Sequence, residues 1–318
     1  MMRFALATLV LASMAEAHLT IWHPSLYGFN WPDVGDAVVQ HGQLNAPVNP
    51  ARGMDNLTVD EWFGHNMLNC TPAKGAFMEL EAGKTVTFEI GCNRAHTTYR
   101  PPEWSYKTMP LLEYCCPERG PLHTANNFGT PYNKLNVSLF GGTALAIAYE
   151  SDPYKVKPED MVVISVNYTS PWFRLVDYQI PPSLPRCPKG GCLCTWNWIH
   201  TRMNGEGYGN EIYNTMYKCK VTGKTSKFSF IPNPVPPEQD CAGNPENCTP
   251  GPKQPMYMFQ KDGNNLPSPT PHTETPTYVS RFADGAQLDV VVGAAAHTGP
   301  SVALSVTVAI GVLVLCTI

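Results

Sequence analysis

The sequence predicts an all-β protein, an antiparallel β-sandwich with long loops stapled by disulfides, and three observations support this prediction. The chain carries 31 prolines and 25 glycines beside 43% hydrophobic residues, a balance that favours turns over helices. Long apolar stripes with the 3.6-residue period of an amphipathic helix are absent from the sequence. Short aromatic and β-branched runs recur instead, each bounded by Pro, Gly or Asn, as is typical of strands.

The first 17 residues are typical of a secretory signal peptide. Arg3 precedes an apolar run from Phe4 to Met14, and Ala15 and Ala17 supply the small residues of a cleavage site. Cleavage after Ala17 would make His18 the first residue of the mature protein. We therefore predict a signal peptide over residues 1–17 and a single domain of about 275 residues over 18–292.

The C-terminal residues 293–318 predict a glycosylphosphatidylinositol anchor signal. Small residues at Gly293–Ala296 are followed by the polar spacer His297–Ser301 and then by the apolar run Val302–Ile318. No Lys or Arg follows this run, which disfavours the alternative of a genuine spanning helix. We therefore expect a secreted protein that is held at the outer leaflet of the cell membrane or at the wall.

The chain opens with a predicted strand and loop over residues 18–30, whose aromatic side chains Trp22, Tyr27 and Phe29 are expected to be exposed. Glu61–Phe63 predicts a short turn element. Lys84–Ile90 alternates polar and apolar residues strictly, which predicts a strand. The strands that follow are expected at Ala144–Tyr149, Met161–Val166, Pro171–Ile180, Cys194–His200 and Glu211–Cys219.

The last two predicted strands bring polar side chains together. Side chains alternate between the faces of a strand, so Trp196, Trp198 and His200 share one face of the first strand. Glu211 and Tyr213 share one face of the second. If the two strands pair as a hairpin across the Gly-rich loop at 201–210, these side chains converge at the loop end.

An N-terminal histidine has a particular metal chemistry. The free α-amine and the imidazole Nδ1 of His18 could chelate one ion together, and a second imidazole would complete a T-shaped set of three nitrogens that suits copper. The alternative is that cleavage merely falls before a histidine. Spacing does not single out His123 as the second imidazole from His41, His65 and His96, which are expected to be solvated in polar loops.

Composition narrows the remaining function classes. The net charge of −4 and the absence of a basic patch argue against nucleic acid as a partner, and no hydrolase or nucleotide-binding motif is present. Ten cysteines precede the apolar run, so up to five disulfides are expected in a secreted chain, in preference to a zinc site at Cys187, Cys192 and Cys194. Glycosylation sequons lie at Asn56, Asn69, Asn136, Asn167 and Asn247.

Seven segments carry a resemblance to a known family. They are HLTIWHPSLYGFN from His18, EWFGH from Glu61, ALAIAYESD from Ala144, KPEDMVVISVNYT from Lys157, RCPKGGCLCTWNWIH from Arg186, NEIYNTMYKC from Asn210 and PKQPMYMFQKDGNN from Pro252. In this order they resemble the lytic polysaccharide monooxygenases of auxiliary activity family 14, fungal enzymes associated with xylan. The resemblance implies an immunoglobulin-like β-sandwich and one copper ion, Cu(I) or Cu(II), in a histidine brace.

The same resemblance implies a role for each candidate residue. His18 and His123 would be the brace ligands, with His96 as the alternative to His123 because the segment after His123 is longer than in the family. Tyr213 would be the axial ligand, and His200 would lie in the second coordination sphere. Glu211 stands where the family has Gln, and a carboxylate donates a hydrogen bond only when it is protonated.

Two functions remain open at this stage. The first is copper-dependent oxidative cleavage of xylan or a cellulose-associated polysaccharide by a monomeric enzyme. This enzyme would take electrons from an external donor and use O2 or H2O2 as co-substrate. The second is a cell-surface copper-binding protein that handles the metal and does not cut glycans. Trp22, Tyr27 and Phe29 are candidates either for stacking on sugar rings or for packing inside the fold.

Overall fold

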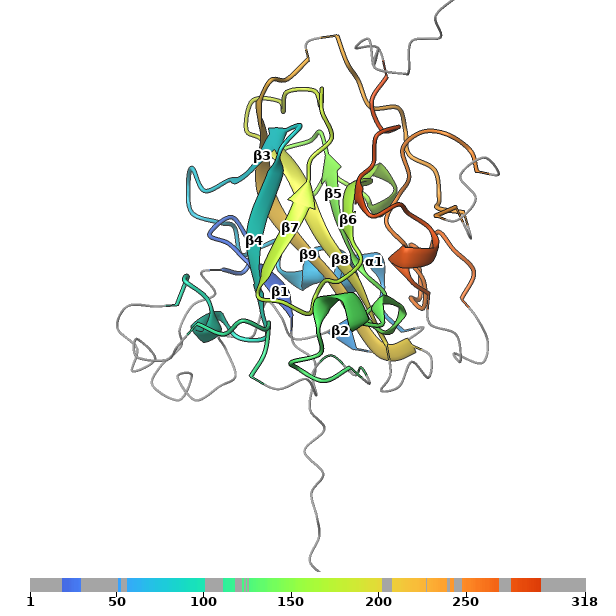
Figure 1. The fold of residues 1–318 in the computed structure, drawn as a ribbon. Coiled ribbons are helices and arrows are strands. Elements are labelled where there is room, and N and C mark those ends of the chain that lie inside the picture. The colour runs from blue at the N-terminus through green and yellow to red at the C-terminus, as the bar shows by residue number, and fades with distance from the viewer. Residues whose placement is uncertain are drawn as a thin grey trace, which may run out of the picture.

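The computed structural model shows two β-sheets packed face to face (Figure 1). It describes residues 19–29, 51–52, 56–100, 111–117, 122, 124, 126–201, 208–226, 228–238, 241–242, 248–268 and 276–292, with only the backbone at 51–52, 201 and 208–212. The predicted β-sandwich is confirmed in this part of the chain. His18, His123 and the apolar run Val302–Ile318 lie outside the described residues.

The smaller sheet has three strands in the order β1 (Thr20–Trp22), β4 (Thr85–Gly91) and β7 (Leu175–Gln179), all antiparallel. The polar–apolar alternation around Phe88 turns one face of β4 inward, as predicted, so Phe88 and Ile90 are buried. Val176 and Tyr178 of β7 lie on the same buried face.

The larger sheet has the order β10–β6–β5–β8–β9–β2, with β3 paired to β9 off this path. Its strands are β2 (Ala51–Arg52), β3 (Met78–Ala82), β5 (Thr143–Ala148), β6 (Val162–Asn167), β8 (Cys192–Thr201), β9 (Tyr208–Gly223) and β10 (Gly285–Ala286). The short helical elements are α1 (Val59–Trp62), η3 (Phe63–Asn66), η4 (Arg94–His96), η7 (Tyr132–Lys134), η8 (Val137–Leu139), η9 (Pro158–Asp160) and η12 (Tyr278–Ser280).

The core lies on both faces of the larger sheet. Leu145 and Trp196 face the smaller sheet and pack with Ile21, Ile90 and Tyr178. The opposite face is covered by α1, η3 and the loops around residues 256–259 and 278–282. Every residue of β5 is therefore buried, which explains why the strand is apolar from Ala144 to Ala148 and why the hydroxyl of Thr143 is hydrogen-bonded to Tyr178.

Two features depart from the predicted pattern. β3 was not foreseen as a strand, and it pairs with β9 in parallel, from Met78 beside Cys219 to Ala82 beside Gly223. The sandwich is therefore not antiparallel throughout. In addition, β9 begins at Tyr208, so it enters the stretch expected to be a loop, whereas β7 is shorter than its predicted range.

Candidate functional site

His200 and Tyr213 lie side by side on the inner face of the larger sheet, near the turn of the β8–β9 hairpin. Trp198 pairs with Tyr213 across the two strands, which confirms the predicted hairpin and its faces. The ring centroid of Trp198 lies 4.9 Å from that of His200 and 4.9 Å from that of Tyr213. His200 is fully buried and Tyr213 is 2% exposed. The two candidate residues thus form one aromatic cluster with Trp198.

The backbone pairing is irregular next to His200. Ile199 pairs with Ile212 whereas Thr201 pairs with Tyr208, so a single residue of β8 lies opposite residues 209–211 of β9. Such bulges redirect side chains at the end of a ladder. The backbone places Glu211 opposite His200 and two positions before Tyr213. The side chain of Glu211 lies outside what the structure describes.

Strand β1 is tied to β9 by a buried group of hydroxyls. Thr20 Oγ1 lies 2.9 Å from Thr215 Oγ1 and 2.8 Å from the hydroxyl of Tyr217. The Tyr217 hydroxyl donates a hydrogen bond of 2.9 Å to the carbonyl of Ile21. Thr215 and Tyr213 are two residues apart and share a face of β9. The beginning of the described chain is therefore held next to the strand that carries Tyr213.

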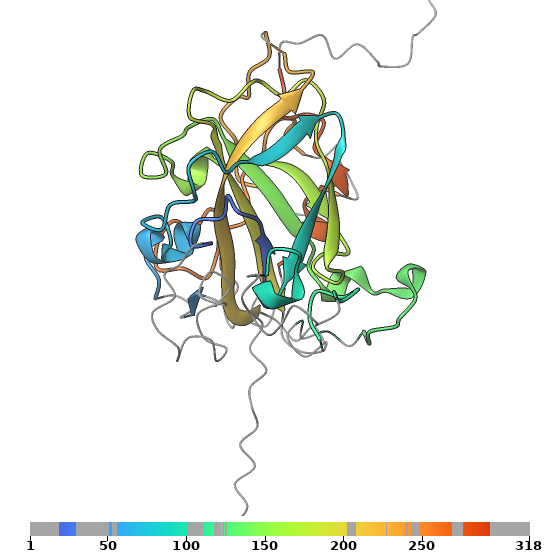
Figure 2. The ribbon, with the colours of Figure 1, turned by 90° about the vertical axis from the view of Figure 1, so that its left-hand side faces the viewer.

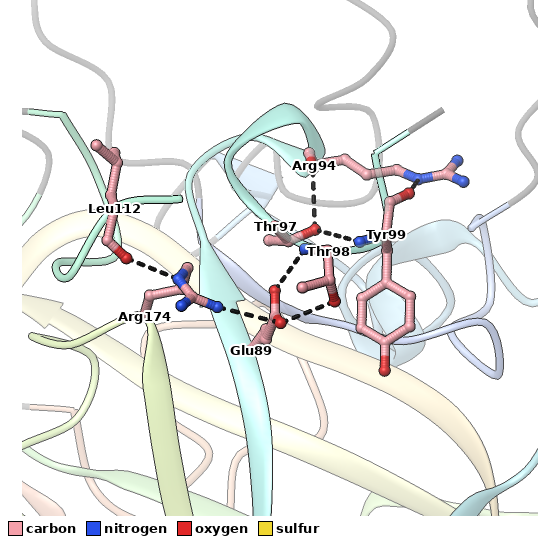
Figure 3. Close-up of polar contacts among 7 residues, drawn as sticks. All are labelled: Glu89, Arg94, Thr97, Thr98, Tyr99, Leu112 and Arg174. Atoms are coloured by element: carbon pink, nitrogen blue, oxygen red, sulfur yellow. Dashed lines mark hydrogen bonds and ion pairs between the residues drawn. The ribbon is translucent and has the colours of Figure 1, made fainter. Parts of the chain in front are cut away.

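A second polar network fixes the segments that follow β4 at this end of the sandwich (Figure 3). The carboxylate of Glu89 accepts hydrogen bonds from Thr98 N at 2.7 Å and Thr98 Oγ1 at 2.8 Å. It also forms an ion pair of 3.1 Å with Arg174, in which the two side chains are only 12% and 13% exposed. Arg174 Nε donates to the carbonyl of Leu112 at 2.6 Å. The network thus joins β4, the residue that precedes β7, the turn at 93–100 and the segment 111–117.

Arg94, a residue of the turn at 93–100, stabilises this turn and joins it to the N-terminal segment. Its Nε donates to the carbonyl of Tyr99 at 2.7 Å, and its guanidinium lies 3.9 Å from the centroid of the Phe29 ring (Figure 3 shows the contact with Tyr99). The N-terminal segment and the turn are therefore packed together at Phe29. A cation over an aromatic face adds to this packing.

The histidine candidates differ in what the structure shows of them. His18 and His123 lie outside the described residues, but Leu122 and Thr124, on either side of His123, are each 1% exposed. His96 ends η4 and is half-buried, and its Nδ1 has no hydrogen-bond partner among the described residues. Burial lowers the pKa of His96, so its imidazole is held in the neutral form that can bind a metal.

Four expectations about exposure are wrong. Trp22 and Tyr27 are each 1% exposed, and Trp22 Nε1 donates to the carbonyl of Gly91 at 2.9 Å. Both side chains therefore pack inside the fold and do not offer faces for sugar stacking. Phe29 is half-buried under Arg94. His65, expected to be solvated, is also buried, because η3 lies against the larger sheet.

Six cysteines form disulfides, in the pairs Cys187–Cys192, Cys194–Cys219 and Cys241–Cys248. These bonds confirm the disulfide expectation over the zinc alternative for the first group. Cys70, Cys92, Cys115 and Cys116 are free thiols, so three bonds form among the described residues where up to five were expected. Glu238 lies near the sulfurs of the third disulfide, but a disulfide sulfur is not the thiolate that binds metal.

The Glu89–Arg174 pair and the Thr20–Thr215–Tyr217 hydroxyls were not foreseen from the sequence. The only sequence signal for the hydroxyls is the alternation that puts Thr215 and Tyr217 on the same face as Tyr213. The ion pair joins residues 85 positions apart, and no local pattern marks such a contact.

Comparisons with known proteins agree on one family. The sequence model of the family described as lytic polysaccharide monooxygenase AA14 matches residues 1–315. An AA14 family lytic polysaccharide monooxygenase B from Pycnoporus cinnabarinus is 36% identical over 313 residues, which are 93% of this chain and 76% of the relative. A protein of the same description from Trametes coccinea is 36% identical over 91% of this chain and 66% of its own length.

A solved structure, the extended catalytic domain of H. jecorina LPMO9A, is similar over 86% of this chain and 95% of its own, with 13% identity and a TM-score of 0.29.

Proposed function

The chain belongs to the AA14 family of lytic polysaccharide monooxygenases, a family of copper enzymes, and we propose that this member cleaves xylan or a cellulose-associated polysaccharide oxidatively. Bound copper would supply the redox chemistry, with electrons from an external donor and with O2 or H2O2, that hydroxylates a C–H bond beside a glycosidic bond. The observation that supports this proposal best is the convergence of His200 and Tyr213 with the start of the N-terminal strand at one end of the sandwich.

We propose that His18 and His123 would hold the copper, with Tyr213 as a further ligand. Thr20 lies within hydrogen-bond distance of both Thr215 and Tyr217, so the start of β1 lies against the part of β9 that follows Tyr213. His18 precedes Thr20 by two residues and Tyr213 precedes Thr215 by two residues, and this closeness along the chain supports the proposed pair of ligands. One amine and two imidazoles form a donor set that suits copper, and a phenol oxygen is a weak further ligand. The residues present thus fit the metal.

The surrounding side chains would position the reaction. The ring of Trp198 stands edge-on to His200 with an interplanar angle of 83°, which restricts the rotation of the imidazole. A buried imidazole held in this way can accept or donate a proton at a fixed position. Glu211 would face the same space. As a carboxylate it accepts hydrogen bonds, so proton donation there would fall to His200 unless Glu211 is protonated.

The second candidate function is a cell-surface protein that binds copper without cutting glycans. The observation that favours it is Glu211, which stands at the position where the family has Gln. One experiment separates the two functions. The mature protein, beginning at His18 and loaded with copper, is given ascorbate and peroxide with xylan-coated cellulose, chitin or β-glucan, and the products are analysed by mass spectrometry.

We expect oxidised oligosaccharides that are absent from a His18→Ala control. Tight copper binding with no oxidised product on any glycan would reject the enzyme and leave the metal-handling protein. Glu211→Gln then tests the cause, because products that appear only in this variant would identify the carboxylate as the block. A methionine retained ahead of His18 should weaken copper binding strongly, since it moves the α-amine away. An unchanged affinity would contradict the brace.

We further propose that residues 1–17 are removed on secretion and that the tail 293–318 attaches the protein to the outer leaflet through a glycosylphosphatidylinositol anchor. Within the described ranges, no helix is both long and apolar enough to cross a membrane. Asn69 and Asn136 are exposed and open to glycosylation. Asn167 is different, because its side-chain nitrogen already donates to the carbonyl of Asp177 at 3.0 Å.

A further inference from the structure

Apolar side chains gather on the surface where the described chain ends. Phe228 is 84% exposed, the highest value among the large hydrophobic side chains of the described residues. Phe230 is 56% exposed and Val292, the last described residue of the chain, is 44% exposed. We refer to Phe228, Phe230 and Val292 as the C-terminal patch. Exposed aromatic side chains that cluster in this way commonly mark an interaction surface.

The backbone places these three side chains on one surface. Phe230 and Val292 exchange two hydrogen bonds, each of 3.0 Å, so they are directly opposite residues of an antiparallel bridge and their side chains lie on the same side of it. Ser229 points the other way: it is only 9% exposed and its hydroxyl donates to the carbonyl of Ser183 at 2.8 Å. Phe228 and Phe230, on either side of Ser229, therefore both face outward.

The sequence beyond the patch indicates what covers it. The apolar run Val302–Ile318 begins ten residues after Val292. Even a fully extended chain spans at most about 3.6 Å per residue, so the run starts within about 36 Å of the patch. If the tail attaches the protein as proposed, whether it enters the bilayer itself or is exchanged for a lipid anchor, the membrane is within reach of this end of the domain. Lys224 and Lys227 precede Phe228 in the sequence, and a lysine side chain can extend its ammonium group to the phosphates of the headgroups.

We propose that the C-terminal patch rests on the lipid bilayer, with Phe228 and Phe230 inserted among the headgroups of the outer leaflet. Phe is among the apolar residues that proteins lying on a membrane bury at the boundary between headgroups and acyl chains. The inference rests on the proposed membrane attachment of the tail and is independent of the copper chemistry.

The docked patch fixes the direction in which the candidate copper site faces. β9 runs from Tyr208 at the hairpin turn to Gly223, and Phe228 follows five residues later. Tyr213 is ten residues before Gly223, which corresponds to about 33 Å of strand. In Figure 1 the end of β8 and the start of β9 lie at the bottom and the described chain ends at the top, and Figure 2 shows the same separation after a turn of 90°. The site therefore faces away from the membrane, toward the wall.

Quenching of tryptophan emission by brominated lipid tests this orientation. The full chain is inserted into vesicles of phosphatidylcholine with a minor share of phosphatidylserine, with and without brominated acyl chains. Phe228→Trp adds an emitter within the patch. The matched control is Tyr132→Trp, because Tyr132 is also an exposed aromatic, at 64%, and its ring lies 6.1 Å from that of Phe173, beside Arg174 of the Glu89 network. Emission of the unsubstituted chain is subtracted from both.

We expect brominated lipid to remove most of the extra emission of Phe228→Trp and to leave that of Tyr132→Trp unchanged. Two results would overturn the inference while the membrane attachment stands. One is a vesicle-bound chain in which neither variant is quenched. The other is a Phe228→Trp emission that changes with the density of protein on the vesicle but is not quenched by brominated lipid. This result would show that a second copy of the chain covers the C-terminal patch. A full chain that does not float with vesicles would reject the attachment and the docking together.

Discussion

The hydroxyl of Tyr217 offers a direct test of how the N-terminal strand is held against the larger sheet. It donates to the carbonyl of Ile21 and lies within hydrogen-bond distance of Thr20 and Thr215, and the whole side chain is buried. In Tyr217→Phe the two threonine hydroxyls still bond to each other at 2.9 Å, so the carbonyl of Ile21 is the group left unpaired. With about 1 kcal/mol for each lost hydrogen bond and a desolvation cost for that carbonyl, the free energy of unfolding should fall by about 3 kcal/mol.

A loss of this size corresponds to a melting temperature about 6–12 °C lower for a domain of this length. We also expect the dissociation constant for Cu(II) to rise about tenfold, or about 1.4 kcal/mol, because Thr20 is two residues from the proposed ligand His18. Urea unfolding measures the first effect and calorimetric titration of copper into the mature protein measures the second.

Tyr178→Phe is the matched control. The Tyr178 hydroxyl is equally buried, lies 2.6 Å from Thr143 Oγ1 and accepts a hydrogen bond from Trp196 Nε1 at 3.0 Å, yet it belongs to β7 and bonds to no residue of β1. The Tyr178→Phe variant should lower the free energy of unfolding to a similar degree as Tyr217→Phe and leave the copper affinity unchanged. Equal losses of copper affinity in both variants would refute the reasoning, since the effect would then follow from general stability.

Three further predictions concern stability. Burial lowers the pKa of His23 from 6.5 to about 4, so on acidification the unfolded chain takes up a proton at this residue before the folded chain does. The contribution of His23 to the free energy of unfolding is therefore fully present above about pH 6.5, and it falls by at most about 3 kcal/mol as the pH approaches 4. Urea unfolding of His23→Asn over this range should show a shallower decline, and an identical slope would contradict the assignment. Glu89→Gln leaves the largely buried Arg174 guanidinium without its anion, so the free energy of unfolding measured by calorimetry should fall by about 2 kcal/mol. Replacing Cys194 and Cys219 by Ala removes a bond that spans 25 residues and should cost about 3 kcal/mol in denaturant titrations.

The parts of the fold that the sequence predicts correctly are those encoded by local alternation. Trp196, Trp198 and His200 share a face because strand geometry dictates it, and the pairing of Trp198 with Tyr213 follows from the hairpin. The same alternation predicts the neighbouring positions of His200 and Tyr213, because they lie on two strands that follow one another in the sequence. His18 and His123 enter it through family resemblance, and their roles stay predictions.

The parts that the sequence did not predict depend on contacts between distant segments. Trp22 resembles an exposed aromatic residue when only its neighbours in sequence are considered, but β4 and the turn after it cover its ring. The same holds for β3, whose partner β9 lies about 140 residues further along the chain. Alternation identifies the faces of a strand, whereas the partner that covers each face is decided by the assembled fold.

The uninterrupted course of β9 has a consequence for how such sequences can diverge in length. One strand pairs with β8, β2 and β3 and also meets the N-terminal segment at Leu26. Insertion of one residue between Tyr213 and Cys219 would exchange inner and outer faces for everything beyond it, and would disrupt all of these contacts at once. We therefore expect natural length variation, and any productive library of insertions, to avoid Tyr208–Gly223 and to fall in the connecting loops. This strand then provides a fixed frame for aligning distant relatives.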